Sequence, residues 1–165
     1  MTIAVQVEKL TFIFPTGWLA SKYDDWSFYR EQFSRQFNGI QAVDLLARGP
    51  DATVYLIEVK DYRHPDAEKP SQLPQAIANK VLMTLAALLP AKLNGNDPGE
   101  RTIAGEVLKG RKLRVIAHIE LPKAHQPVVD PADLKQKLAQ LLRAVDAHPK
   151  VVSKDNMHRL GWTVT

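Results

Sequence analysis

Three ionisable residues, Asp44, Glu58 and Lys60, lie inside two stretches of the sequence that otherwise have the composition of buried strands. A charge within an apolar strand destabilises the fold unless a partner compensates it. Glu58 and Lys60 are two positions apart, so their side chains project from the same face of their strand. Carboxylates beside a lysine can hold a divalent cation and activate a water molecule, which is hydrolytic chemistry.

The two stretches, residues 40–47 and 53–62, are joined by Arg48-Gly49-Pro50-Asp51-Ala52, which predicts an antiparallel hairpin. A turn centred on Asp51 pairs residues whose numbers add up to 102, which places Asp44 opposite Glu58. Their Cβ atoms would then be about 4.5–5.5 Å apart. The two carboxylates would repel each other, and Mg²⁺ or Mn²⁺ between them would remove the repulsion. A slip in the turn would abolish this pairing.

The arrangement resembles the PD-(D/E)XK nuclease superfamily, in which an Asp strand is followed by a Glu-x-Lys strand and then a helix. The matching pieces are Val43-Asp44 and Glu58-Val59-Lys60, and the resemblance extends over about residues 24–121. It implies that Asp44 and Glu58 bind the metal with help from the Val59 carbonyl. It also implies that Lys60 orients or activates the attacking water. Some members add a carboxylate from the first helix, and Glu31 is the matching candidate.

The sequence departs from this family at two points. Val43 stands where the family often has proline. Phe37 to Ile40 leaves no room for the strand that usually follows the first helix, so that strand must come from residues 3–14 or be absent. A second interpretation also stays open, in which Glu58 and Lys60 form an edge-strand ion pair and Asp44 faces solvent. The setting of two apolar strands and a following helix favours the nuclease-like site.

The remaining elements follow from periodicity and from turn residues. We expect one or two strands over 3–14, helices over 26–37, 71–89 and 130–145, a strand over 113–121 and a short final strand. Residues 63–70 are expected to form a loop and 94–112 a flexible excursion. This order predicts an α/β (α+β) fold, a restriction-endonuclease-like mixed sheet flanked by helices, in a single domain over residues 1–165.

Several residues outside the three-residue motif are candidates for contact with nucleic acid. They are Gln75 and Lys80 on the helix after the motif, Arg63 just after its strand, and the basic cluster Lys109, Arg111 and Lys112, with Arg114 nearby. A basic cluster can neutralise phosphates. For each of these residues an ordinary solvated surface is the competing interpretation.

Composition limits the classes of function. The chain has 165 residues, a net charge of +4 and no cysteine, so disulfide, thiolate and zinc-finger chemistry are excluded. The apolar stretches are short and no signal peptide is recognisable, so we expect a cytoplasmic protein with no membrane partner. No glycine loop suited to phosphates precedes a helix, so nucleotide-dependent activity is not expected.

The function that these observations favour is a Mg²⁺- or Mn²⁺-dependent nuclease acting on DNA in preference to RNA. The alternative is a catalytically silent nuclease-fold module that binds nucleic acid or a protein. A third interpretation is an unrelated interaction domain in which the three residues coincide by accident. A homodimer would lengthen the binding surface of so small a chain.

Overall fold

The computed structural model describes residues 1–64, 71–123 and 129–165. Most of the expected loop over 63–70 therefore lies outside the described residues. The strands are β1 (Ile3–Val7), β2 (Leu10–Phe14), β3 (Leu19–Lys22), β4 (Leu45–Arg48), β5 (Thr53–Asp61), β6 (Lys112–Glu120), β7 (Lys150–Val152) and β8 (Thr163–Val164). The α-helices are α1 (Leu73–Asn94), α2 (Pro98–Leu108) and α3 (Pro131–Leu141). Three short helical turns, η1 (Tyr23–Asp25), η2 (Phe28–Phe33) and η3 (Gln36–Asn38), join β3 to β4.

Two sheets form the framework of this mixed α+β fold. The larger sheet has the strand order β3-β4-β5-β6-β7, and β3, β4 and β5 are antiparallel neighbours. Strands β6 and β7 run parallel to β5, because α1 with α2, and then α3, provide the crossovers. The smaller sheet has the order β1-β2-β8.

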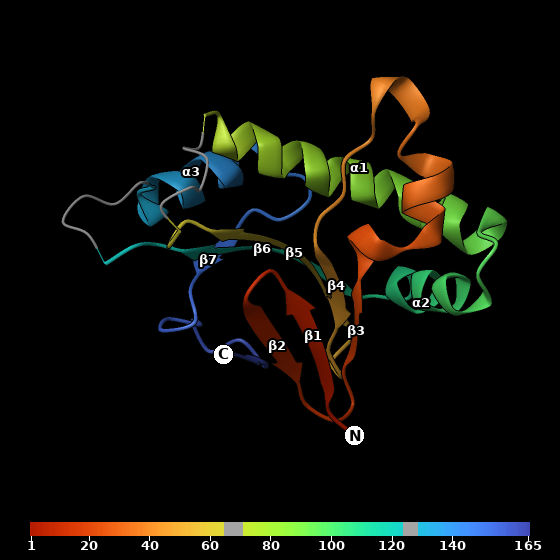
Figure 1. The fold of residues 1–165 in the computed structure, drawn as a ribbon, viewed down its shortest axis with the longest axis horizontal. Helices are drawn as coiled ribbons and strands as arrows, with labels where there is room; N and C mark the ends of the chain where they lie inside the picture. The colour runs from red at the N-terminus through yellow and green to blue at the C-terminus, as the bar shows by residue number, and fades with distance from the viewer. Residues whose placement is uncertain (65–70, 124–128) are drawn as a thin grey trace.

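The molecule has three layers (Figure 1). Helices α1 and α3 cover one face of the five-stranded sheet, and the small sheet lies on the other face. One hydrophobic core lies on each face of the large sheet, and β5 contributes to both because its side chains alternate between the faces. Leu56 faces the helices, while Ile57 and Val59 face the small sheet. Glu58 and Lys60 follow Leu56 by two and four positions on the same strand, so their side chains also lie on the face covered by the helices.

The hairpin, the strand at 113–121 and the helix that begins after Asp130 are confirmed, and so is the final strand. Asp130 caps α3 by accepting a hydrogen bond from the Ala132 amide at 3.0 Å. The strand predicted over 40–47 is shorter at its start and forms β4. The strand that lies beside β4 comes from residues 19–22, and not from 3–14.

Three predictions, two of helices and one of a flexible excursion, were wrong in extent or type. The helix over 26–37 is replaced by short turns, of which η2 is a π-helical turn closed by Ser34 N–H donating to Tyr29 O at 2.8 Å. The excursion over 94–112 contains α2, which Asp97 caps by accepting from the Glu100 amide. Helix α1 continues through Pro90, because its last turn is anchored by Ala91, which is fully buried.

Helix α1 is the longest helix, with 22 residues. Its length and composition alone would allow it to cross a membrane. However, Leu73, Ile77, Val81 and Leu88 on one side of it are buried against the sheet. We therefore describe it as a helix that packs one side into the core of the fold.

Candidate active site

The hairpin register brings Asp44 and Glu58 together. Leu45 pairs with Ile57 and Leu46 with Leu56, which is the register predicted from the turn at Asp51. Asp44 directly precedes β4 and lies opposite Glu58 in the continuation of this register. The Asp44 Oδ2 atom accepts a hydrogen bond from the Val59 amide at 2.7 Å, which holds its carboxylate over β5. Asp44 is half-buried and does not simply face solvent.

Glu58 is a buried carboxylate with only part of its hydrogen-bonding capacity satisfied. Its side chain is 1% exposed, and its Oε1 atom accepts from Lys80 Nζ at 2.5 Å. Lys60 Nζ is 3.5 Å from the same oxygen. Within the described part of the chain, Glu58 Oε2 is buried and has no hydrogen-bond partner. An unpaired buried carboxylate oxygen is unfavourable and is available to a ligand.

The electrostatics of this pair favour protonation of Glu58. Burial and the charge of Asp44 raise the pKa of Glu58 to about 7, although Lys80 and Lys60 act against the shift. For Lys80, burial favours the neutral form, but the charge and hydrogen bond of Glu58 outweigh it, and the pKa of Lys80 is raised. At neutral pH the site thus contains a carboxyl group poised between its two protonation states beside a cationic lysine.

A third carboxylate approaches from η1, and it belongs to Asp24. Burial and the charge of Asp44 raise the pKa of Asp24 to about 6. Its Oδ1 atom is buried without a hydrogen-bond partner among the described residues, and Lys22 Nζ is 3.7 Å from it. The Tyr23 amide donates to the Asp44 carbonyl at 2.9 Å, which ties η1 to the start of β4.

Glu31, the acid suggested by the resemblance, is exposed on η2. Within the described chain, no hydrogen bond or ion pair joins it to Asp44 or Glu58. Asp24 is the acid whose charge interacts with that of Asp44 instead, because η1 follows β3 directly and β3 pairs with β4. The sequence signal for this was weak, since Leu19-Ala20-Ser21-Lys22 is short and only partly apolar.

The candidates for nucleic-acid contact are distributed differently from the prediction. Lys80 belongs to the carboxylate site. Arg63 is bound to Asp61 through two hydrogen bonds, at 2.8 and 2.6 Å. Lys109 pairs with Glu106 at 2.6 Å. Arg114 pairs with Asp146 at 3.1 Å, whereas Arg111 and Lys112 are exposed before and at the start of β6.

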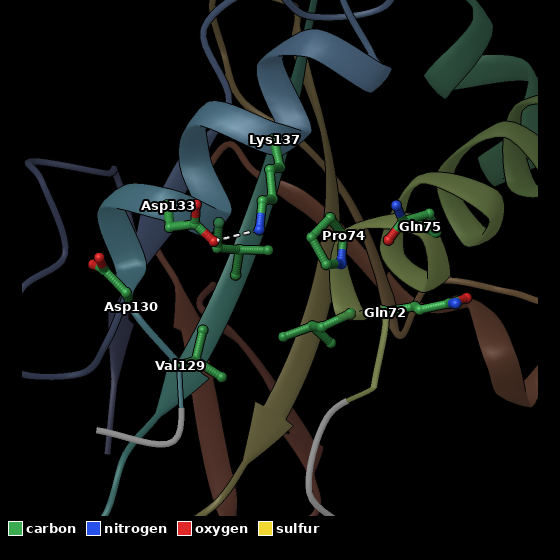
Figure 2. A pocket seen from close by; sticks show the side chains of 9 residues that line it. Gln72, Pro74, Gln75, Val129, Asp130, Asp133 and Lys137 are labelled. Atoms are coloured by element: carbon green, nitrogen blue, oxygen red, sulfur yellow. Dashed lines mark ion pairs between the residues drawn. The ribbon is translucent and has the colours of Figure 1, made fainter. Parts of the chain in front are cut away.

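Gln75 lies in a cavity of about 400 Å³ between the N-terminal ends of α1 and α3. Figure 2 shows Lys137 and Asp133 on α3 facing Pro74 of α1, and the two charged side chains form an ion pair at 2.8 Å. Neither Asp44 nor Glu58 lines this cavity. Gln75 is thus separated from the carboxylate site, with which the prediction had grouped it.

A separate polar cluster on the opposite face of the sheet was not predicted. His118 Nε2 is 2.8 Å from Glu120 Oε1, which also accepts from the Lys154 amide at 2.7 Å. Burial lowers the pKa of His118, although Glu120 acts in the other direction. His118 has an apolar neighbour in Phe12, whose ring centroid is 5.1 Å away. This cluster fastens the segment after β7 to β6.

The donor set of the carboxylate site fits a hard divalent cation. Among the described residues no three His, Asp or Glu side chains form a ready-made metal cage. Mg²⁺ commonly needs only one or two carboxylates and completes its coordination with water and substrate oxygens. Asp44 and the unpaired Oε2 of Glu58 provide two such carboxylates. The contact seen at Val59 is made by its amide, not its carbonyl.

Comparison with known proteins gives one informative similarity. The chain is 30% identical over 145 aligned residues to a cysteine–tRNA ligase of Neisseria meningitidis serogroup A. The alignment covers 70% of this chain but 21% of that ligase, so the chain spans about a fifth of the relative's length. No family model matches the sequence. No solved structure matches the fold.

Proposed function

We propose that the chain is a metal-dependent nuclease with a restriction-endonuclease-like core, in which Asp44, Glu58 and Lys60 form the active site. The observation that supports this most strongly is the approach of two carboxylates across β4 and β5, one of them buried with a free oxygen. A structural ion pair is better suited when both carboxylate oxygens are satisfied, because burying one unpaired destabilises the fold. The antiparallel strands β3, β4 and β5, followed by α1 and the parallel strand β6, also agree with the proposed core.

In this proposal Asp44 and Glu58 hold Mg²⁺ or Mn²⁺, and water and substrate oxygens complete the coordination. When bound, the cation would lower the pKa of the attacking water and neutralise charge on the phosphate. Lys60 is half-buried beside Glu58, where its ammonium can orient the water and stabilise the developing negative charge. Lys80 balances the charge of Glu58 while the site is free of cation.

Cleavage of labelled DNA and RNA with Mg²⁺ or Mn²⁺ tests the proposal. The wild type should cleave one of them, and chelation should stop the reaction. Lys60→Ala should reduce turnover by about 10²–10⁴-fold while leaving metal binding largely intact, because a lysine is not a metal ligand. Asp130→Asn, which changes a carboxylate far from the site, is the matched control and should cleave normally. Absence of metal-dependent cleavage of every substrate would contradict the catalytic assignment.

The second candidate is a catalytically silent module of the same fold that binds RNA. Two observations favour it: Lys80 already occupies one oxygen of Glu58, and the chain is similar to part of a cysteine–tRNA ligase. This module would bind tRNA in preference to DNA of equal length and would cleave neither. The same assay, with binding measured beside cleavage, separates the two functions.

A further inference from the structure

A second group of charged residues surrounds a cavity at the β7 edge of the large sheet. The cavity has a volume of about 270 Å³ and is lined by Lys135 of α3, Lys150 and Val151 of β7, and His158 and Arg159. Among the residues that the structure describes, no carboxylate lines this cavity. Three permanent cations beside a histidine create a positive potential that a small anion would neutralise.

The backbone at this cavity adopts a conformation that its residues disfavour. Leu160 N–H donates to Met157 O at 3.0 Å, which closes a turn whose two central residues are His158 and Arg159. Their φ angles are +48° and +60°, as in a type I′ turn, where Asn and Gly are preferred. Such strain is retained mainly where side chains have a task. Here the turn places two cationic or ionisable side chains on the same cavity.

Lys150 connects this turn to the sheet. Its Nζ atom donates to the His158 carbonyl at 3.3 Å, so the turn is held beside β7. Lys150 has further donors available, because an ammonium carries three. The cavity therefore combines a fixed lysine with an arginine, whose planar guanidinium suits the oxygens of a phosphate.

An adjoining cavity of about 210 Å³ shares Val151 and His158 with the first one. Its polar lining includes Ser153 and Asn156 and the carboxylates of Glu120 and Asp155, which can form hydrogen bonds with hydroxyl groups. The two cavities thus offer an anionic subsite beside a hydroxyl subsite. We propose that together they bind a phosphate monoester of a small hydroxylated molecule, such as a sugar phosphate.

This binding site does not depend on the proposed nuclease function. It lies at the edge strand β7, whereas Asp44 directly precedes β4 and Glu58 lies on β5, two or more strands away in the sheet order. A monoester is favoured over a phosphodiester because its second negative charge better balances the three cations that line the first cavity, whereas the carboxylates lie in the second. The small volume likewise favours a compact ligand over a polymer.

Calorimetric titration of the intact chain tests the proposal, with ribose 5-phosphate, inorganic phosphate and ribose as ligands at constant ionic strength. Ribose 5-phosphate should bind, inorganic phosphate more weakly, and ribose undetectably. Arg159→Gln and Lys150→Gln should each weaken binding by about tenfold or more, because a charge-assisted contact is lost. Arg35→Gln removes an equal charge from an exposed site elsewhere and should bind as the wild type does.

Melting temperatures of the variants ensure that each is folded, and both substituted side chains are solvent-accessible enough for the fold to be kept. Equal binding by wild type and Arg159→Gln would overturn the proposal, and so would undetectable binding of all phosphates. A short oligonucleotide with and without a 5′-phosphate distinguishes the source of the group. Binding only of the phosphorylated form would support the monoester chemistry. Equal binding of both forms, weakened by Arg159→Gln, would contradict it.

Discussion

The Lys80 ammonium lies 2.5 Å from Glu58 Oε1, and it therefore supplies within the fold the positive charge that a buried carboxylate needs. The lysine is carried by α1, one layer above the strand that carries the glutamate. The other oxygen, Oε2, has no partner among the described residues. Lys80 and a divalent cation bound at Oε2 would therefore both neutralise the charge of the same carboxylate.

Lys80→Met should increase the affinity for Mn²⁺ and lower the stability of the cation-free protein. Removing the ammonium ends its electrostatic competition with the metal, while the buried carboxylates lose their compensating charge. Without Mn²⁺, the melting temperature of Lys80→Met should be lower than that of the wild type. Addition of Mn²⁺ should then raise the melting temperature of the variant by more than it raises that of the wild type. Lys137→Met, on α3, removes a lysine from an exposed ion pair and should alter neither quantity appreciably. A metal-induced rise that shrinks in Lys80→Met would contradict the competition.

Stability should depend on pH through Glu58. The pKa of Glu58 is about 7 in the folded protein and about 4.5 when unfolded, so between these values the folded state holds a proton that the unfolded chain releases. The contribution of Glu58 to the free energy of unfolding is therefore lost as the pH rises from about 4.5 through 7. This loss is on the order of 3 kcal/mol in total. Glu58→Gln should remove this dependence.

Urea unfolding of the wild type and of Glu58→Gln between pH 5 and 8 measures this effect. His118 acts in the opposite direction, because its lowered pKa makes stability rise with pH up to about 6.5. The difference between the two proteins cancels the His118 contribution. As the pH rises, the free energy of unfolding of Glu58→Gln should increase relative to that of the wild type. A difference between the two proteins that does not change with pH would show that the pKa of Glu58 is not raised.

Asp44→Asn should leave the cation-free protein at least as stable as the wild type. The amide oxygen can still accept from the Val59 amide, while the repulsion of Glu58 disappears. The gain at pH 8 should be about 1 kcal/mol, or about 3 °C in melting temperature for a domain of this size. The structural ion-pair interpretation makes the opposite prediction, a loss of stability on this substitution. Thermal unfolding without divalent metal distinguishes them.

Nucleic-acid binding should weaken steeply with salt, by orders of magnitude between about 50 and 200 mM. Arg111 and Lys112 are exposed and are the members of the basic cluster best placed to contact phosphates. Replacing both by Gln should reduce the slope of log affinity against log salt by about 1.5–2. Lys109→Gln is the control, since Lys109 already pairs with Glu106, and its effect should be smaller. Fluorescence anisotropy at several salt concentrations provides the slopes, and equal slopes would exclude this surface.

The hairpin and its register could be predicted because they depend on local features. The turn residues between β4 and β5 and the alternation along both strands allow few pairings, and the one centred on Asp51 proved right. Helix α2 could not be predicted in the same way. Gly99 and Gly105 disfavour a helix, and the contacts that stabilise it come from elsewhere, such as Glu100 with the amide and hydroxyl of Ser27.

Which other residues belong to the candidate site also could not be predicted from the local sequence. The partnership of Lys80 with Glu58 depends on how α1 is rotated over the sheet, which is determined by its buried residues together. The charges of Asp24 and Asp44 interact only because the short strand β3 pairs with β4, and nothing in four residues of mixed polarity indicates that pairing. Glu31 was chosen from a helix that the fold does not form.

Direct measurement of Mn²⁺ binding tests the central claim most sharply. The wild type and Asp44→Asn should be titrated with Mn²⁺ at pH 8, where Glu58 is ionised, and bound metal followed by the loss of the free-ion electron paramagnetic resonance signal. We predict one saturable Mn²⁺ site in the wild type and at least about tenfold weaker binding in Asp44→Asn, because one of two carboxylate ligands is lost. Wild-type protein that binds no Mn²⁺, or binds it equally well after Asp44→Asn, would contradict the assignment of Asp44 and Glu58 as a metal site.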